Sequence, residues 1–213
     1  MQAIWSVWFL TLRLRYSYDF LPDHPHYSSG ILVSNTPGAV DDATATTALY
    51  LMLSALRQFS KAERNLRTGQ WKEGLYSGNA HDATGRTVAI LGLGGIGMRL
   101  AELVHAFPMR VVYHNRSPAN NAPSWCEYFP AERLDEMLAQ ADVLSIHVPL
   151  NSATEGLVSE EMIRKLKKGA IIVNTARGKV IDEDAMIRAL EDGHVSQYFN
   201  FATLMSTSFT HVD

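Results

Sequence analysis

The six residues from Gly92 to Gly97 have the types and spacing that hold phosphate groups. Glycines at 92, 94 and 97 follow the pattern G-x-G-x-x-G. In such a pattern the first glycine permits a tight turn, the second lets a phosphate approach the main chain, and the third lets a helix pack closely on the preceding strand. A helix that begins there offers free N–H groups and a positive dipole end, which stabilise an anion by about 0.3–2 kcal/mol. The chemistry that this spacing favours is the binding of a pyrophosphate.

The segments around these glycines are the elements that such a turn requires. The apolar run 88–91 predicts a buried strand, 98–106 predicts a helix with an apolar face, and 110–114 predicts a second strand. A glycine-rich turn that merely joins two elements is the alternative, but strand, turn, helix and strand in this order favour a dinucleotide-binding unit. The residues that this unit would place against the cofactor are Gly92, Leu93, Gly94, Gly95, Ile96 and Gly97.

The residues after the second strand predict which dinucleotide binds. In NAD sites an Asp or Glu about 20 residues beyond the glycines accepts a hydrogen bond from the ribose 2′-OH. Here the chain has Asn115, Arg116 and Ser117, and the next acidic residue is Glu127. Arg116 can pair with a 2′-phosphate, to which Asn115 and Ser117 can donate, and a charge-assisted hydrogen bond contributes about 1.5–3 kcal/mol. We therefore predict NADP, with NAD as the alternative if Arg116 is only a solvated loop residue.

Composition limits the class of protein. The chain has 213 residues, of which 46% are hydrophobic and 19% charged, as is typical of a folded globular protein. The net charge of −3 does not favour nucleic acid or an anionic membrane as partner. The apolar run 3–12 is too short to span a bilayer. The lone Cys126, which we expect to be buried, fits a reducing compartment and a cytoplasmic location.

A long amphipathic helix is predicted before the glycine turn. Asp41 or Asp42 can cap it, and it would run to about Arg67. Apolar residues at helical spacing would form its buried face, by core or interface packing. These residues are Leu49, Met52, Leu53, Leu56 and Phe59.

Beyond the second strand, predicted helices alternate with predicted strands. The helices cover 131–139, 159–167 and 182–190, with Gly193 suited to a C-cap, and the strands cover 143–147 and 170–174. This alternation predicts an α/β fold with a doubly wound parallel sheet, a Rossmann domain. We place an atypical N-terminal segment at 1–33, the nucleotide-binding domain with its linking helix at 34–196, and a divergent tail at 197–213.

From about Gly30 to Val195 the chain resembles the D-isomer-specific 2-hydroxyacid dehydrogenase family. Within that family, Asn115-Arg116-Ser117 is similar to the pattern of NADPH-using glyoxylate and hydroxypyruvate reductases. The resemblance implies a nucleotide domain paired with a flavodoxin-like substrate domain, and a homodimer built partly by the long helix. The motifs that carry it are Val33-Ser34-Asn35-Thr36-Pro37-Gly38, Gly92 to Gly97, His147-Val148-Pro149-Leu150 with Thr154, and Asn174-Thr175-Ala176-Arg177-Gly178 followed by Val180, Asp182 and Glu183.

The resemblance also implies roles for individual residues. Val148 and Pro149, with Thr154, match the loop beside the cofactor ribose, and Thr175, Ala176 and Arg177 match the loop on the nicotinamide side. Arg177 matches the catalytic arginine of the family. A fixed guanidinium can hold the carboxylate of a 2-keto acid and stabilise the carbonyl oxygen as it becomes negative. No metal ligand is predicted.

The chain departs from the family pattern after Ser196. The family places a catalytic His and its acidic partner downstream of the arginine, whereas no Asp or Glu occurs between Gly193 and Val212 and His211 is the only histidine after His194. The loop that holds the substrate carboxylate is also not found before Gly30. We therefore expect a chain that is incomplete at both ends relative to the family, with a remnant of the substrate domain and a sheet that loses its strands after Val195.

Three interpretations follow from the sequence. The first is an oxidoreductase that uses NAD(P)H to reduce a small 2-keto acid such as glyoxylate or hydroxypyruvate, slowed about 10²–10⁴-fold by the missing acid. The second is a non-catalytic module that binds a dinucleotide or forms a dimer. The third is a chain too incomplete to fold.

Overall fold

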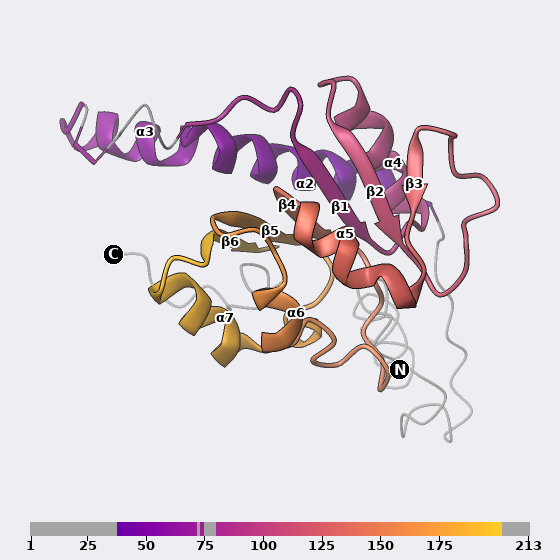
Figure 1. Ribbon diagram of the computed structural model, residues 1–213. Helices are drawn as coiled ribbons and strands as arrows, with labels where there is room; N and C mark the ends of the chain where they lie inside the picture. The colour runs from indigo at the N-terminus through magenta and orange to yellow at the C-terminus, as the bar shows by residue number, and fades with distance from the viewer. Residues whose placement is uncertain (1–37, 72, 75–79, 202–213) are drawn as a thin grey trace, which may run out of the picture.

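A computed structural model describes residues 38–71, 73–74 and 80–201. It shows a six-stranded sheet in the order β3-β2-β1-β4-β5-β6, in which every neighbouring pair is parallel (Figure 1). The predicted doubly wound α/β fold is therefore confirmed. The predicted segment 1–33 and the tail beyond 201 lie outside the described residues. The strands are β1 (Thr87–Leu91), β2 (Arg110–His114), β3 (Cys126–Tyr128), β4 (Val143–Ile146), β5 (Ala170–Asn174) and β6 (Val195–Asn200).

Helices cover both faces of the sheet (Figure 1). One apolar cluster joins α2 and α4 to residues such as Val88 and Ile90. The other joins α5, α6 and α7 to residues such as Ala89 and Leu91. Because successive side chains of β1 face opposite clusters and all are buried, the strand is apolar throughout, as in parallel sheets covered on both sides. The helices are α2 (Asp41–Arg57), α3 (Phe59–Arg67), α4 (Gly95–His105), α5 (Leu134–Gln140), α6 (Glu160–Arg164) and α7 (Glu183–Glu191), with 3₁₀ turns η2 (Ala131–Arg133) and η3 (Gly178–Val180).

The prediction of one helix up to Arg67 was wrong, because the helix breaks at Gln58. This residue adopts a left-handed conformation, with φ 56° and ψ 28°. The Ser54 and Ser60 hydroxyl oxygens lie 2.6 Å apart, and the Ser60 N–H also donates to Ser54 Oγ, which fixes the start of α3. Phe59, predicted on the buried face, is consequently 53% exposed.

The predicted cap of this helix was also wrong. Val40 is the N-cap residue of α2 and no side chain caps it, while Asp41 and Asp42 lie in the first turn. The caps of two later helices are side chains: Ser159 accepts from the Met162 N–H in α6, and Asp182 accepts from the Ala185 N–H in α7.

The strand β6 corrects the expectation that the sheet ends after Val195. It continues past Ser196 to Asn200 and pairs in parallel with β5, with Tyr198 beside Ile172. Phe199 packs against the apolar cluster that contains α2, and the Gln197 side-chain amide donates to the Ala55 carbonyl of α2 at 2.9 Å. Residues 197–200, which we placed in a divergent tail, thus supply most of the sixth strand.

The short strand β3 was not predicted. Its first residue, Cys126, is buried as expected, and burial raises the pKa of its thiol to about 11. The thiol is therefore protonated at neutral pH and lacks the thiolate character of a nucleophile.

Candidate functional site

Two glycines bring β1, α4 and β4 into close contact. Gly92 has φ 100°, and a Cβ built there would lie 3.0 Å from the His147 carbonyl carbon and from the Val148 nitrogen. A Cβ on Gly97 would lie 2.3 Å from the Gly92 carbonyl oxygen. Any side chain at either position would push these elements apart, so the two glycines are required by the packing of the main chain.

The middle of the glycine turn is open. A Cβ on Gly94 would meet no atom within 4 Å, and Gly94 is the N-cap of α4 without a capping side chain. No side chain therefore covers the main chain at the start of α4, where the positive end of the helix dipole lies. This arrangement fits a pyrophosphate, as the glycine spacing predicts.

A cavity of about 340 Å³ lies at the carboxyl ends of β1, β4 and β5. It brings together the glycine turn, the loop after β4 and the loop after β5, which is where open α/β sheets bind ligands. The residues that line it are Asp41, Gly94, Gly95, Ile96, Gly97, His147, Val148, Pro149, Leu150, Thr175, Ala176 and Arg177.

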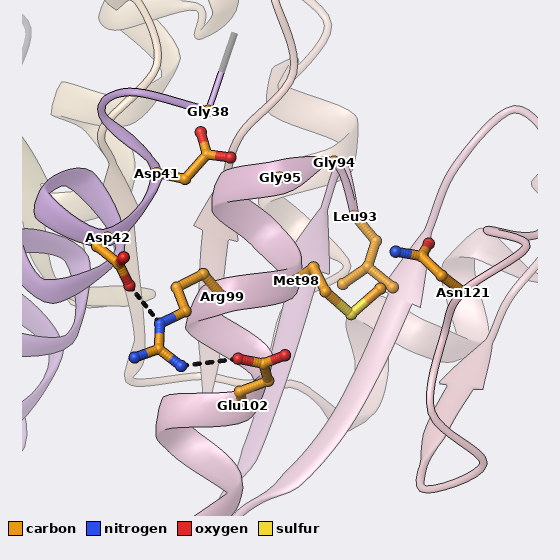
Figure 2. A pocket seen from close by; sticks show the side chains of 10 residues that line it. All are labelled: Gly38, Asp41, Asp42, Leu93, Gly94, Gly95, Met98, Arg99, Glu102 and Asn121. Carbon is orange, nitrogen blue, oxygen red and sulfur yellow. Dashed lines mark hydrogen bonds and ion pairs between the residues drawn. The ribbon is translucent and has the colours of Figure 1, made fainter.

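A second cavity of about 450 Å³ lies against the glycine turn, between the starts of α2 and α4 (Figure 2). Leu93, Gly94 and Gly95 line it, together with Asn121 from the loop after β2. On its floor Arg99 binds two carboxylates, with Nε 2.5 Å from Asp42 and Nη1 2.8 Å from Glu102.

The predicted residues that line neither cavity are Gly92, Asn115, Arg116, Ser117 and Thr154. Asn115 Oδ1 accepts from the Leu93 N–H at 2.7 Å, so this side chain fixes the glycine turn from the neighbouring strand end. Arg116 and Ser117 are exposed in the same loop.

Thr154 shapes the loop after β4 from within. Its Oγ1 donates to the Pro149 carbonyl at 2.6 Å and accepts from the Asn151 N–H at 2.8 Å. Thr154 therefore holds Val148 and Pro149 against the cavity without lining it.

The loop after β5 is fixed by a buried amide. Asn174 is fully buried; its Nδ2 donates to the Arg177 carbonyl at 2.8 Å, and its Oδ1 accepts from the Ala176 N–H at 3.0 Å. The Arg177 guanidinium also donates to the Ala176 carbonyl at 2.8 Å. Arg177 thus reaches the cavity from a loop whose main chain is held at both ends.

His147 was not predicted as a site residue, although it belongs to the motif that precedes Val148. Its Nε2 lies 2.9 Å from Ser145 Oγ, and its Nδ1 lies 3.4 Å from Thr175 Oγ1. Burial lowers its pKa to about 4, so the ring is neutral at neutral pH. The motif marks His147 in sequence, and the pairing of β4 with β5 brings its ring beside Thr175.

Comparison with known proteins agrees with this geometry. Residues 49–200 match the model of the D-isomer specific 2-hydroxyacid dehydrogenase, NAD binding domain, so the chain belongs to this family. The resemblance seen in the sequence is therefore confirmed. Among the described residues, no helix has the length and apolar character needed to cross a membrane.

Several relatives have similar sequences or structures. The chain is 43% identical over 178 residues to 4-methyl-2-oxopentanoate reductase A of Aspergillus oryzae, covering 84% of this chain and 53% of that protein. It is 42% identical over 183 residues to glyoxylate reductase 1 of Saccharomyces cerevisiae, covering 84% and 51%. A glyoxylate reductase structure from Paecilomyes thermophila superposes with a TM-score of 0.76 at 39% identity, covering 88% of this chain and 57% of that one. The chain spans about half the length of the curated relatives it matches.

We expect the His147 ring to titrate near pH 4, well below the ordinary 6.5 for histidine. In the unfolded chain this residue gains its proton at higher pH than in the folded protein. The contribution of His147 to the free energy of unfolding is therefore fully present above about pH 6.5 and is lost as the pH falls toward 4. An NMR titration of the ring carbons tests this, with His147→Gln as the control that flattens this part of the stability curve. A ring that titrates near 6.5 would contradict the expected burial effect.

Proposed function

We propose that this chain is the nucleotide-binding part of an oxidoreductase that uses NAD(P)H to reduce a small 2-keto acid of the glyoxylate or hydroxypyruvate type. The observation that carries the proposal is a single cavity lined by both the open glycine turn and Arg177. One wall suits a pyrophosphate, and the other offers a cation to a substrate carboxylate. Residues 49–200 match the 2-hydroxyacid dehydrogenase family, and two similar proteins are named as reductases. Both findings support this proposal.

Each part of the cavity has a role in this reaction. The bound nicotinamide cofactor supplies the hydride. The main chain of Gly94 to Gly97 would hold the pyrophosphate, while Val148 and Pro149 would lie beside the cofactor ribose. Arg177 binds the substrate carboxylate and stabilises the negative charge that develops on the carbonyl oxygen.

The new alkoxide also needs a proton, and the source of this proton is the remaining question for the site. Among the described residues that line the cavity, the only histidine is His147, whose lowered pKa keeps it neutral. The proton therefore comes from water or from a group outside this cavity. We expect turnover by this chain to be slower by about 10²–10⁴-fold than with a positioned general acid.

We expect Arg177→Ala to lower kcat/KM for glyoxylate by about 10²-fold or more, because the charge on the reacting oxygen loses its fixed partner. The measurement is glyoxylate-dependent oxidation of NADPH, together with NADPH affinity, which should change little. Lys168→Ala, which removes an exposed cation that lines neither cavity, is the matched control. Unchanged turnover in Arg177→Ala would exclude the proposed role.

A non-catalytic dinucleotide-binding module is the second candidate function. The observation that favours it is a complete glycine turn beside a cavity whose described lining holds no charged histidine. Binding of NADPH without any glyoxylate-dependent turnover would support this candidate over the enzyme.

We further propose NADP as the preferred cofactor, with NAD as the alternative. The Asn115 Oδ1 acceptor already binds the Leu93 N–H, which leaves the Asn115 amide N–H groups as donors. The next acid, Glu127, pairs with Arg110. The Asn115 amide can therefore donate to a 2′-phosphate, with no free carboxylate in this loop to repel it. Arg116 in the same loop adds a positive charge.

We expect Arg116→Ala to weaken NADPH binding by about tenfold or more and NADH binding much less, since one charge-assisted hydrogen bond of about 1.5–3 kcal/mol is lost. Fluorescence titration with both cofactors measures the two dissociation constants. Ser117→Ala, which removes a neutral donor from the same loop, should show a smaller effect. Equal losses for both cofactors would show that Arg116 does not contact the phosphate.

We also propose that the chain forms a homodimer through α3. This helix extends away from the sheet, and none of its residues is buried (Figure 1). Phe59 and Leu66 on it are 53% and 57% exposed, and Trp71 beyond it is 67% exposed. An apolar stripe of this kind stabilises a helix when a second surface covers it.

Phe59→Glu combined with Leu66→Glu should shift the protein from dimer to monomer, because two buried charges would face the partner. Sedimentation equilibrium measures the molecular mass. Arg64→Glu, which places a negative charge on the same helix but away from the face that carries Phe59 and Leu66, is the control that should leave the dimer intact. A wild-type monomer, or a dimer that survives both substitutions, would contradict this interface.

Finally, we propose a cytoplasmic location. The lone cysteine supports it, because Cys126 is buried with no second thiol to form a disulfide within the chain.

A further inference from the structure

Asp41 places a carboxylate on the first residue of α4. A Cβ built on Gly95 would lie 2.1 Å from Asp41 Oδ2 and 2.8 Å from Asp41 Cγ, so the carboxylate occupies the space of the missing side chain. Figure 2 shows Asp41 beside the turn where α4 begins. Together with Gly94 and Gly95, Asp41 lines both cavities, and it therefore stands in the wall that they share.

The Asp41 carboxylate also lies at the start of α2. Asp41 is the first residue of α2, and Gly95 is the first residue of α4. One carboxylate therefore lies at the positive dipole ends of two helices. The neighbouring Asp42 differs, because it pairs with Arg99. In the described part of the chain, no Lys, Arg or His forms an ion pair with Asp41.

We propose that Asp41 is an internal anion that competes with the cofactor pyrophosphate for the start of α4 and so limits cofactor affinity. This inference rests on the proposed function of the glycine turn. A pyrophosphate on Gly94 and Gly95 would meet the same helix end that the carboxylate faces. Two anions at one helix end repel each other, so the carboxylate must move or the cofactor must bind less tightly.

The first test is cofactor affinity. Asp41→Asn keeps the shape of the side chain and removes its charge, and it should tighten NADPH binding by about fivefold or more, since like charges at a binding site are costly. Asp184→Asn is the matched control: it removes an exposed charge from the first turn of α7, lines neither cavity, and should leave NADPH affinity unchanged. Unchanged or weaker binding in Asp41→Asn would overturn the proposal.

The second test needs no cofactor. If the carboxylate stabilises two helix ends, Asp41→Asn should lower the Tm of the free protein by about 1–4 °C, and by more than Asp184→Asn does. An unchanged or higher Tm would show that the carboxylate does not bind the helix end, and would overturn the proposal even if no variant bound NADPH. Absence of NADPH binding by all variants, with the Tm lowered as expected, would contradict the proposed function and leave the contact of Asp41 with α4 supported.

Discussion

The close approach of the main chain around Gly92 and Gly97 is the constraint on which the rest of the structure depends. The Gly92 carbonyl oxygen lies where a side chain on Gly97 would be, and the main chain of His147 and Val148 lies where one on Gly92 would be. This packing draws α4 onto β1 and brings the loop after β4 to the glycine turn. The bare helix end and the cavity next to it are consequences of the same contact.

Short polar side chains then fix the loops that surround this contact. Asn115 ties the end of β2 to Leu93, Thr154 closes the loop after β4, and Asn174 holds the loop that carries Arg177. Each binds main-chain N–H or C=O groups that regular secondary structure leaves unpaired at the carboxyl ends of the strands. Loops held in this way position a ligand with little loss of conformational entropy on binding.

The sequence predicts those parts of the fold that rest on local pattern. The buried strands β1, β2, β4 and β5 are apolar runs, and the glycine spacing marks the turn between β1 and α4. In contrast, β6 contains the polar residues Gln197 and Asn200, which are not typical of a buried strand. Its Phe199 side chain packs against an apolar cluster made of residues distant in the sequence. The break at Gln58 likewise depends on a contact between two serines, which helical periodicity does not contain.

The same difference separates the predicted site residues from those that were missed. The residues of the glycine turn and Arg177 belong to motifs that are contiguous in sequence. Asp41 and His147 enter the site only because α2 begins beside α4 and because β4 is paired with β5. His147 does belong to a contiguous motif, but its contact with Thr175, like that of Asp41 with Gly95, comes from the meeting of separate elements.

The placement of acidic side chains gives this site its particular character. At the end of β2, the described loop residues Asn115, Arg116 and Ser117 carry no carboxylate, and Glu127 pairs with Arg110 at the start of that strand. At the start of α4, the Asp41 carboxylate places a negative charge against Gly95. Under the two proposals above, the site would favour anion binding at one end of the cofactor and oppose it at the other. Selectivity between the two cofactors depends only on the first end, because both carry the same pyrophosphate. The overall affinity depends on both ends, so in this fold selectivity and affinity can be adjusted by different residues.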